Sequence, residues 1–375
     1  MKLSVQLKLQ PTSEQADALQ RTLERANEAC NSISRVAWET KTFRQFAVHK
    51  LVYQDTRETF GLTAQVVVRC IAKVANAYKL DRTVQRTFSL HGAIAYDDRI
   101  LSFALPKSNV SIWTLDGRQA IPFVCGDRQR QLLLLQRGET DLALVDGAWY
   151  LFAVCEVETP APIDVEGVLG IDLGVTNIST DSTGEIHSGK GIKNVRYRHR
   201  RLRQTLQRLG TKGSRRRLHR LAGQERRFAT WTNHTISKRI VAKAERTKRA
   251  IALEDLSHIR TRVRARRSQR AILHSWAFFQ LRAFIAYKAA LAGVPVYLVD
   301  PRNTSRTCPA CGCIDKANRK TQASFVCISC GFAGHADVIA AGNIARRAPV
   351  SVPYCSDADL RVGSARAKST RCSGG

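Results

Sequence analysis

The sequence predicts a chain of two main domains, the second of mixed α/β class and interrupted by a small cysteine-containing insertion. Three observations support this organisation. Short segments of alternating polarity, separated by turn residues, fill residues 86–159. After residue 166, apolar strands alternate with helical segments. Two Cys-x-x-Cys pairs then follow within residues 308–330.

The first domain is predicted to be an antiparallel sheet or small barrel with a helical unit inserted after its first strand. Residues 1–10 alternate apolar and polar side chains, which indicates a strand and not a signal peptide. Thr12 can cap a following helix while Gln15 completes a capping box. Apolar residues then recur at helical spacing as far as Ala37, and a second helix is predicted at 63–80.

Turn chemistry predicts hairpins in the rest of this domain. Asp-Gly pairs at 116–117 and 146–147 separate alternating segments, as expected for tight turns between antiparallel strands. A proline-marked linker at 158–164 then ends the domain.

The segment GVLGIDLGVTN, residues 167–177, opens the second domain and contains an acidic residue where a buried strand is expected. Its apolar run is typical of a buried strand, yet it carries Asp172. A buried carboxylate without a partner is costly, so a basic neighbour, backbone donors or a metal ion must compensate it.

Charge is concentrated in the second domain. The chain has 375 residues and a formal net charge of +29, and residues 190–270 alone contain 27 Lys and Arg against 4 Asp and Glu. Residues 196–248 are predicted to be helical with a break at 210–214. An ordinary solvated helix face mixes both signs, so this segment indicates contact with a nucleic-acid backbone. An anionic membrane surface is the weaker alternative, because no lysine-rich amphipathic helix with a bulky apolar face is found. No apolar run approaches the roughly 20 residues that span a bilayer.

The cysteines indicate one metal site in a reducing compartment. The chain has eleven cysteines, an odd number, and they cluster only at 308–330. Two pairs with fifteen residues between them can place four thiolates on one Zn²⁺ ion, which would then be structural because no coordination position stays open. The alternative is a set of reduced cysteines, and Cys313 complicates the choice of the second ligand. The predicted zinc ligands are Cys308, Cys311, Cys327 and Cys330.

Three acidic residues are candidates for a catalytic metal site. Asp172 and Glu254 each lie near the end of an apolar strand, and Asp337 opens a helical run. Each has an ordinary explanation: a turn before Gly174, a strand-end salt bridge, and a carboxylate at a helix N-terminus. Together they match the carboxylates that hold two Mg²⁺ ions in phosphodiester hydrolysis.

Four linked motifs carry a family resemblance: GIDLGVTN, ALEDL, DPRNTSRTCPACG and CISCGFAGHADVIAAGNIARR. They resemble the TnpB family of transposon-encoded, RNA-guided DNA endonucleases, which are similar to the effectors of type V CRISPR systems. The resemblance is specific over residues 167–347. It implies a RuvC nuclease domain of RNase H-like fold, with Asp172, Glu254 and Asp337 as catalytic residues that bind two Mg²⁺ ions, or Mn²⁺ in their place. None of these positions departs from the family pattern, so an active enzyme is expected.

The resemblance also implies the domain organisation. Residues 1–10 and 81–165 would form a wedge β-barrel, and 11–80 a helical recognition lobe. The RuvC-like nuclease would comprise 166–302 and 336–348, interrupted by the zinc ribbon at 303–335. The Pro, Ser and Gly content of residues 349–375 predicts a disordered tail.

The expected function is cleavage of double-stranded target DNA, next to a short motif, under the direction of a structured, transposon-derived guide RNA. No membrane and no protein oligomer are required, and the expected location is the bacterial or archaeal cytoplasm, at the nucleoid. Two alternatives remain: a DNA-joining transposase, since RNase H-like transposases also use three carboxylates, and an RNA-guided protein that binds DNA without cutting it.

Overall fold

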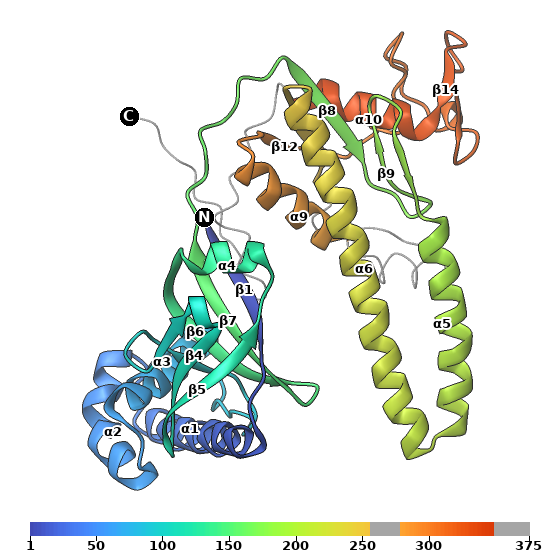
Figure 1. Ribbon diagram of the computed structural model, residues 1–375. Helices are drawn as coiled ribbons and strands as arrows, with labels where there is room; N and C mark the ends of the chain where they lie inside the picture. Colours follow the sequence, from blue (N-terminus) through green and yellow to red (C-terminus); the bar gives the residue numbers. More distant parts are fainter. Residues whose placement is uncertain (256–277, 349–375) are drawn as a thin grey trace. The chain divides into compact units, whose positions relative to one another are not determined.

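The computed structural model describes residues 1–255 and 278–348, which form two compact units (Figure 1). The first unit comprises Met1–Glu158, and the second begins at Thr159. The predicted tail at 349–375 lies outside the described residues, as does the start of the helix expected from residue 270. In the part of the chain that the structure describes, no helix has the length and apolar composition needed to cross a bilayer.

An antiparallel sheet of seven strands forms the centre of the first unit, in the order β2-β6-β7-β1-β5-β4-β3. Its strands are β1 (Lys2–Leu9), β2 (Ile94–Tyr96), β3 (Leu101–Ala104), β4 (Asn109–Thr114), β5 (Gly117–Val124), β6 (Gln136–Val145) and β7 (Ala148–Glu156). The Tyr96 hydroxyl on β2 donates a hydrogen bond to the carbonyl oxygen of Trp113 on β4 at 3.2 Å, and this contact between strands far apart in the order shows that the sheet curls. The hydrogen-bonded order has β2 and β3 at its two ends.

Both predicted Asp-Gly hairpins are confirmed. Asp146 and Gly147 form the whole loop between β6 and β7, with φ angles of 51° and 77°. Two successive positive φ angles define a type I′ turn, whose twist matches that of the flanking strands. Gly117 likewise has a positive φ, of 91°, at the start of β5.

Three helices lie between β1 and β2, and a short helix follows β5: α1 (Ser13–Glu39), α2 (Gln45–Phe60), α3 (Ala64–Leu80) and α4 (Asp127–Leu133). The predicted capping box of Thr12 and Gln15 begins α1. Helix α2 escaped prediction because its buried face is narrow. Only Val48, Val52 and Thr56 are buried along it, and its N-cap residue Arg44 makes no side-chain capping bond.

The second unit has a mixed sheet in the order β10-β9-β8-β11-β12. Strands β8, β9 and β10 pair antiparallel, whereas β11 and β12 run parallel to β8. The strands are β8 (Gly167–Asp172), β9 (Asn177–Asp181), β10 (Ile186–Ser188), β11 (Arg249–Glu254) and β12 (Val296–Val299). The helices are α5 (Lys190–Leu209), α6 (Lys212–Arg246), α9 (Phe278–Leu291) and α10 (Ala336–Arg347).

Helix α10 packs directly on β8, and Gly170 permits this close approach (Figure 1). A Cβ atom at Gly170 would lie 2.0 Å from the carbonyl oxygen of Ala341 and 2.6 Å from the amide nitrogen of Ala345. Because both atoms belong to the helix backbone, no side-chain rotation could relieve the clash. Gly170 therefore fixes the distance between the strand that ends at Asp172 and the helix that begins at Ala336.

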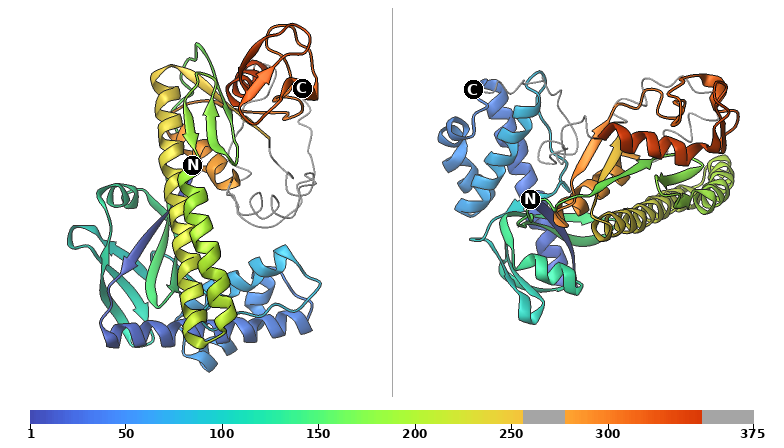
Figure 2. Two further views of the ribbon diagram at one scale, coloured as in Figure 1. Left: turned by 90° about the vertical axis from the view of Figure 1, so that its right-hand side faces the viewer. Right: turned by 90° about the horizontal axis from the view of Figure 1, so that it is seen from above.

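Helices α5 and α6 form an antiparallel hairpin, side by side in both views of Figure 2. The predicted break is confirmed: Gly210 ends α5 in the left-handed conformation, and the Thr211 hydroxyl caps α6. Glu225 on α6 accepts a hydrogen bond from Arg203 at 2.6 Å and lies 3.9 Å from Arg196. This carboxylate offsets repulsion between two strongly basic helices.

Residues 303–335 form a small insertion between β12 and α10. It contains the 3-10 turn η2 (Lys316–Asn318) and a two-stranded antiparallel sheet of β13 (Ser324–Val326) and β14 (Ala333–His335). Its core is small, with Phe325 and Cys327 buried against Ile339 of α10. So few apolar contacts indicate that this insertion needs an additional cross-link.

Candidate active site and metal centre

Two of the three predicted catalytic carboxylates lie side by side at one edge of the second sheet. Asp172 is the last residue of β8 and Glu254 the last residue of β11. These strands pair in parallel, with Ile171 opposite Leu253. Since the carboxyl ends of neighbouring parallel strands meet at the same edge, the register alone brings the two acids together.

Asp337 reaches the same edge from the first turn of α10, the helix that packs on β8. Its side chain is buried, and both oxygens are hydrogen-bonded. Asn177 Nδ2 donates to Oδ2 at 2.9 Å, and the Arg319 guanidinium donates to Oδ1 at 2.6 Å. The third predicted residue is thus held in a fixed orientation.

The electrostatics of the site show that Glu254 and Asp337 both act on Asp172. Burial raises the pKa of Asp172 to about 7, with further contributions from the charges of Glu254 and Asp337, while Arg319 opposes the shift. Burial also raises the pKa of Glu254, although a hydrogen bond from the Thr304 hydroxyl, at 2.5 Å, works in the opposite direction. Like charges are therefore held close together in a partly buried place, where water screens them less than on an open surface.

This donor set fits Mg²⁺. Hard carboxylate oxygens are the ligands that Mg²⁺ takes from proteins, and a divalent cation would remove the repulsion that raises the pKa of Asp172. Arg319 and Arg347 supply two positive charges against three carboxylates, so the protein itself only partly neutralises the site.

Three residues of the site were not singled out by the sequence: Asn177, Thr304 and Arg319. The first two lie inside recognised motifs, in VTN and DPRNTS, but nothing in their spacing assigned them a partner. Arg319 comes from the insertion at 303–335 and contacts Asp337 only through tertiary folding. Asn177 and Thr304 could have been suspected because they are polar residues inside motifs. Nothing in the sequence pointed to Arg319.

The raised pKa of Asp172 predicts a pH-dependent stability in the absence of divalent ions. The unfolded carboxyl ionises near its ordinary pKa of 3.8, whereas the folded one keeps its proton until about pH 7. The folded state binds more protons in this window, so its stability falls as pH rises from about 4 to 7, by roughly 2–4 kcal/mol for this group.

Asp172→Asn removes this titration, so its thermal midpoint should increasingly exceed that of the wild type as pH rises. Thermal unfolding in metal-free buffer between pH 4.5 and 8 measures the difference. A constant offset between the two proteins would contradict the assignment.

The four predicted cysteines of the insertion converge on one point. Their sulfur atoms all lie within 4.8 Å of one another. Cys308 and Cys330 are 3.6 Å apart, and Cys311 and Cys327 are 3.5 Å apart. Thiolates on a tetrahedral zinc with Zn–S bonds of ~2.3 Å would be separated by about 3.8 Å. The geometry fits a Zn²⁺ ion.

The two Cys-x-x-Cys turns are built alike. Gly312 and Gly331 follow the second cysteine of each pair, with φ angles of 75° and 74°, and each amide donates to the carbonyl of the first cysteine. Backbone hydrogen bonds lower the pKa of the Cys327 thiol to about 6, whereas the neighbouring cysteines raise the pKa of Cys330, so one thiolate is favoured without metal and the other ligands would lose their protons on binding zinc. Cys313 lies outside the set of four.

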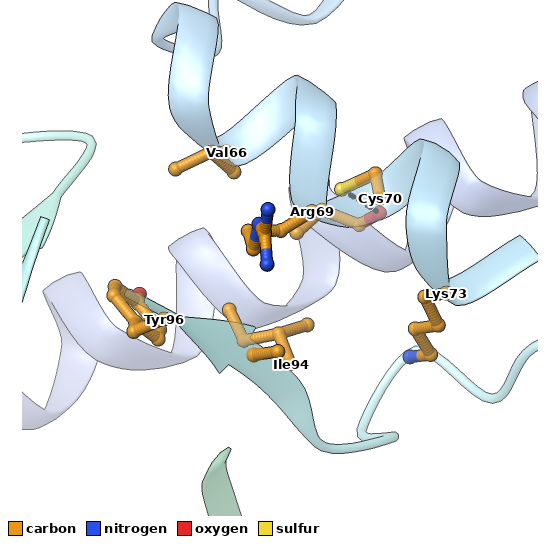
Figure 3. Close-up of a pocket in the computed structure, with 8 residues that line it drawn as sticks. Val66, Arg69, Cys70, Lys73, Ile94 and Tyr96 are labelled. Carbon is orange, nitrogen blue, oxygen red and sulfur yellow. Dashed lines mark hydrogen bonds between the residues drawn. The ribbon is translucent and has the colours of Figure 1, made fainter. Parts of the chain in front are cut away.

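A cavity in the first unit is too small to be a ligand site. Val66, Arg69, Cys70 and Lys73 of α3 line it together with residues of α1 and β2 (Figure 3). Its volume of about 10 Å³ is room for one water molecule. The carboxylate cluster of the second unit, and not this cavity, is therefore the candidate active site.

Two family models match the second unit and cover its candidate residues. Residues 152–258, which include Asp172 and Glu254, match the OrfB_IS605 family, described as "Probable transposase". Residues 278–344, which include Asp337 and the four cysteines, match the Cas12f1-like TNB domain.

Curated relatives extend these matches. The chain is 34% identical over 216 residues to the CRISPR-associated endodeoxyribonuclease Cas12f1 of Sulfoacidibacillus thermotolerans, which covers 52% of this chain and 50% of that protein. It is 35% identical over 127 residues to the TnpB-like protein MJ0751 of Methanocaldococcus jannaschii, covering 34% and 45% of the two chains. The chain thus spans about half the length of the curated relatives it matches. The resemblance to the TnpB family is confirmed.

A solved structure of the mini-RNA-guided endonuclease CRISPR-Cas_phi3 has a similar fold. It aligns with 93% of this chain and 92% of its own, with a TM-score of 0.56 and 12% sequence identity. At this identity the likeness concerns the fold alone.

Proposed function

We propose that this chain, with its TnpB-like second unit, is the RNA-guided DNA endonuclease of a transposable element and cuts double-stranded target DNA next to a short motif. One observation carries the proposal: Asp172, Glu254 and Asp337 meet at one sheet edge, where burial and mutual repulsion raise the pKa of Asp172 to about 7. A structural role would not require three acids to face one another at such a cost.

The sheet supports the RNase H-like (RuvC) assignment of this unit. Three antiparallel strands are followed by two strands parallel to β8, and the carboxylates stand on β8, β11 and α10. On the same proposal, residues 1–10 and 81–165 are the wedge domain, 11–80 the recognition lobe, and 166–302 with 336–348 the nuclease.

The three carboxylates would hold two Mg²⁺ ions, which Mn²⁺ could replace. When bound, such ions activate a water molecule and stabilise the leaving oxygen of a phosphodiester. The protein's own groups prepare the ligands. Asn177 and Arg319 orient Asp337, and Thr304 orients Glu254. Asp172 must lose its proton to act as a ligand, so protons compete with the metal and metal binding should weaken as pH falls.

The basic hairpin of α5 and α6 would bind the nucleic-acid backbone. Helix α5 contains no acidic residue, and α6 contains only Glu225 and Glu245. Guide RNA and target DNA are both polyanions, and neutralising their phosphates releases counterions. The sequence of the target would be read by base pairing with the RNA.

Zinc would hold the insertion at 303–335 together. We expect Cys308→Ser and Cys330→Ser each to lower the zinc content from one ion per chain towards zero and to expose this segment to protease, because the binding free energy of a structural zinc is largely local folding free energy. Elemental analysis and limited proteolysis measure the two effects. Cys313→Ser is the matched control and should retain its zinc. A wild-type chain without zinc would contradict the assignment.

A nuclease assay on the purified full chain tests the proposal. RNA that co-purifies with the chain is sequenced, and plasmids carrying the complementary DNA are incubated with the complex in Mg²⁺. Linearised plasmid is the expected product. Joined DNA ends would favour the transposase alternative, and stable binding without cutting would favour the non-cleaving one.

A further inference from the structure

Helix α6 presents an exposed tryptophan that no part of the proposed chemistry uses. The side chain of Trp231 is 66% exposed, an unusual position for the largest apolar side chain. Phe228, one turn earlier on α6, stacks against the indole ring. The two rings are nearly parallel, with centroids 6.5 Å apart and an interplanar angle of 26°, and Phe228 itself packs on the core of the second unit. One neighbour therefore holds the indole in place while much of its surface faces solvent.

The surroundings of Trp231 are cationic. Arg220, Arg227 and Lys238 are exposed and lie at intervals of eleven, four and seven residues from it, which places them along the same face of α6. The cores of protein interfaces are depleted in charged residues, so this environment does not favour a protein partner. Alternating cations and an aromatic ring are instead typical of surfaces that bind nucleic acid.

A second exposed aromatic residue lies where α6 meets α9. Gln280 of α9 accepts a hydrogen bond from Asn233 at 2.9 Å and donates one to Thr230, the residue before Trp231, at 3.2 Å. Its neighbour Phe279 is 54% exposed.

Phe279 is linked to the candidate active site by a chain of contacts. The Arg282 guanidinium lies 5.4 Å from the centre of the Phe279 ring and donates to Asp255 at 3.1 Å. Asp255 directly follows Glu254 of the candidate active site. These contacts place the junction of α6 and α9 near the end of β11, which carries Glu254 of the candidate site.

We propose that Trp231 and Phe279 form a stacking platform for unpaired bases of the DNA strand being cut, and that the cations beside them hold its phosphates. The inference rests on the proposed nuclease function and deepens it. Only an unpaired strand exposes base faces to a protein ring, so the ligand class is single-stranded DNA and not duplex. Stacking tolerates every base, as a nuclease directed by RNA requires.

Paired oligonucleotides test the platform without any cleavage. One probe is a fluorescent strand of deoxythymidines, and the other is a strand of equal length that lacks the bases but keeps every phosphate. Binding of both to the full chain with its co-purifying RNA is titrated in buffer free of Mg²⁺ and Mn²⁺. Trp231→Ala and Phe279→Ala should each bind the strand with bases about 5- to 150-fold more weakly. Affinity for the abasic strand should be unchanged, because no charge is lost.

Two controls sharpen the comparison. Trp231→Tyr keeps a stacking ring and should retain most of the affinity. Leu134→Ala removes an apolar side chain that is 73% exposed in the first unit and should change neither affinity. An equal loss on both probes, or no loss on either, would overturn the proposal. So would a changed oligomeric state of Trp231→Ala with unchanged probe binding, since that result would identify a protein interface. Because the titration measures binding without cleavage, its result can be interpreted even if the nuclease assay fails.

Discussion

Asp172→Ala, Glu254→Ala and Asp337→Ala should each reduce DNA cleavage in Mg²⁺ by at least about 10³-fold. Loss of a carboxylate that holds a catalytic ion removes several kcal/mol of transition-state stabilisation, and each 1.36 kcal/mol corresponds to a factor of ten in rate. Target binding should stay within about twofold of the wild type, because these side chains act on the reacting phosphate and not on recognition of the duplex. Single-turnover cleavage and a binding titration on the same preparations measure both quantities.

Control variants separate chemistry from folding. Asp172→Asn keeps the shape of the side chain and removes its charge, so it should be as inactive as Asp172→Ala. Glu166→Ala removes an exposed acid of the same unit, which pairs with exposed Lys248, and should cut normally. The assignment fails if any of the three alanine variants cuts at close to the wild-type rate. It also fails if binding is lost while the bound complexes cut normally.

The meeting of the acids was largely predictable from sequence because two local rules act together. Asp172 and Glu254 each end an apolar run, and adjacent parallel strands present their carboxyl ends at one edge. The four cysteines were predictable for a similar reason, since ligand spacing within each pair is a local property. Their metal-binding and catalytic roles stay predictions.

The contacts that orient these acids were not predictable. Arg319 reaches Asp337 only after the insertion has folded against α10, and the pairing of Thr304 with Glu254 joins residues fifty positions apart. Sequence periodicity also cannot show that Trp231 is exposed. An aromatic residue at helical spacing is usually part of a core, and here Phe228 takes that place.

Target choice should follow the RNA. If the segment of the guide that pairs with DNA is replaced, cleavage should move to the newly complementary sequence, while the short DNA motif beside the target stays the same. A base-pair step contributes about 1.4 kcal/mol, so losing even four steps removes roughly 5–6 kcal/mol, or about 10⁴-fold in affinity for the old site. Plasmids that carry the old and new targets beside one constant motif measure the switch.

The basic hairpin of α5 and α6 offers an alternative explanation for RNA binding, in which the RNA is held by charge alone and does not direct the cut. Its cations would bind any polyanion, so affinity that falls with salt establishes only the electrostatic contribution. If base pairing selects the target, replacing the guide must move the cut to a new sequence although the protein is the same. The Asp172→Ala complex is the informative control, because it should occupy the new site without cutting it, which links the new position to the guide and the cut to the carboxylates. If cleavage stays at the old sequence after the guide is replaced, the protein itself reads the target. If the RNA-free chain cuts or joins DNA equally well, the RNA only neutralises the positive charge of α5 and α6. The transposase alternative is then preferred.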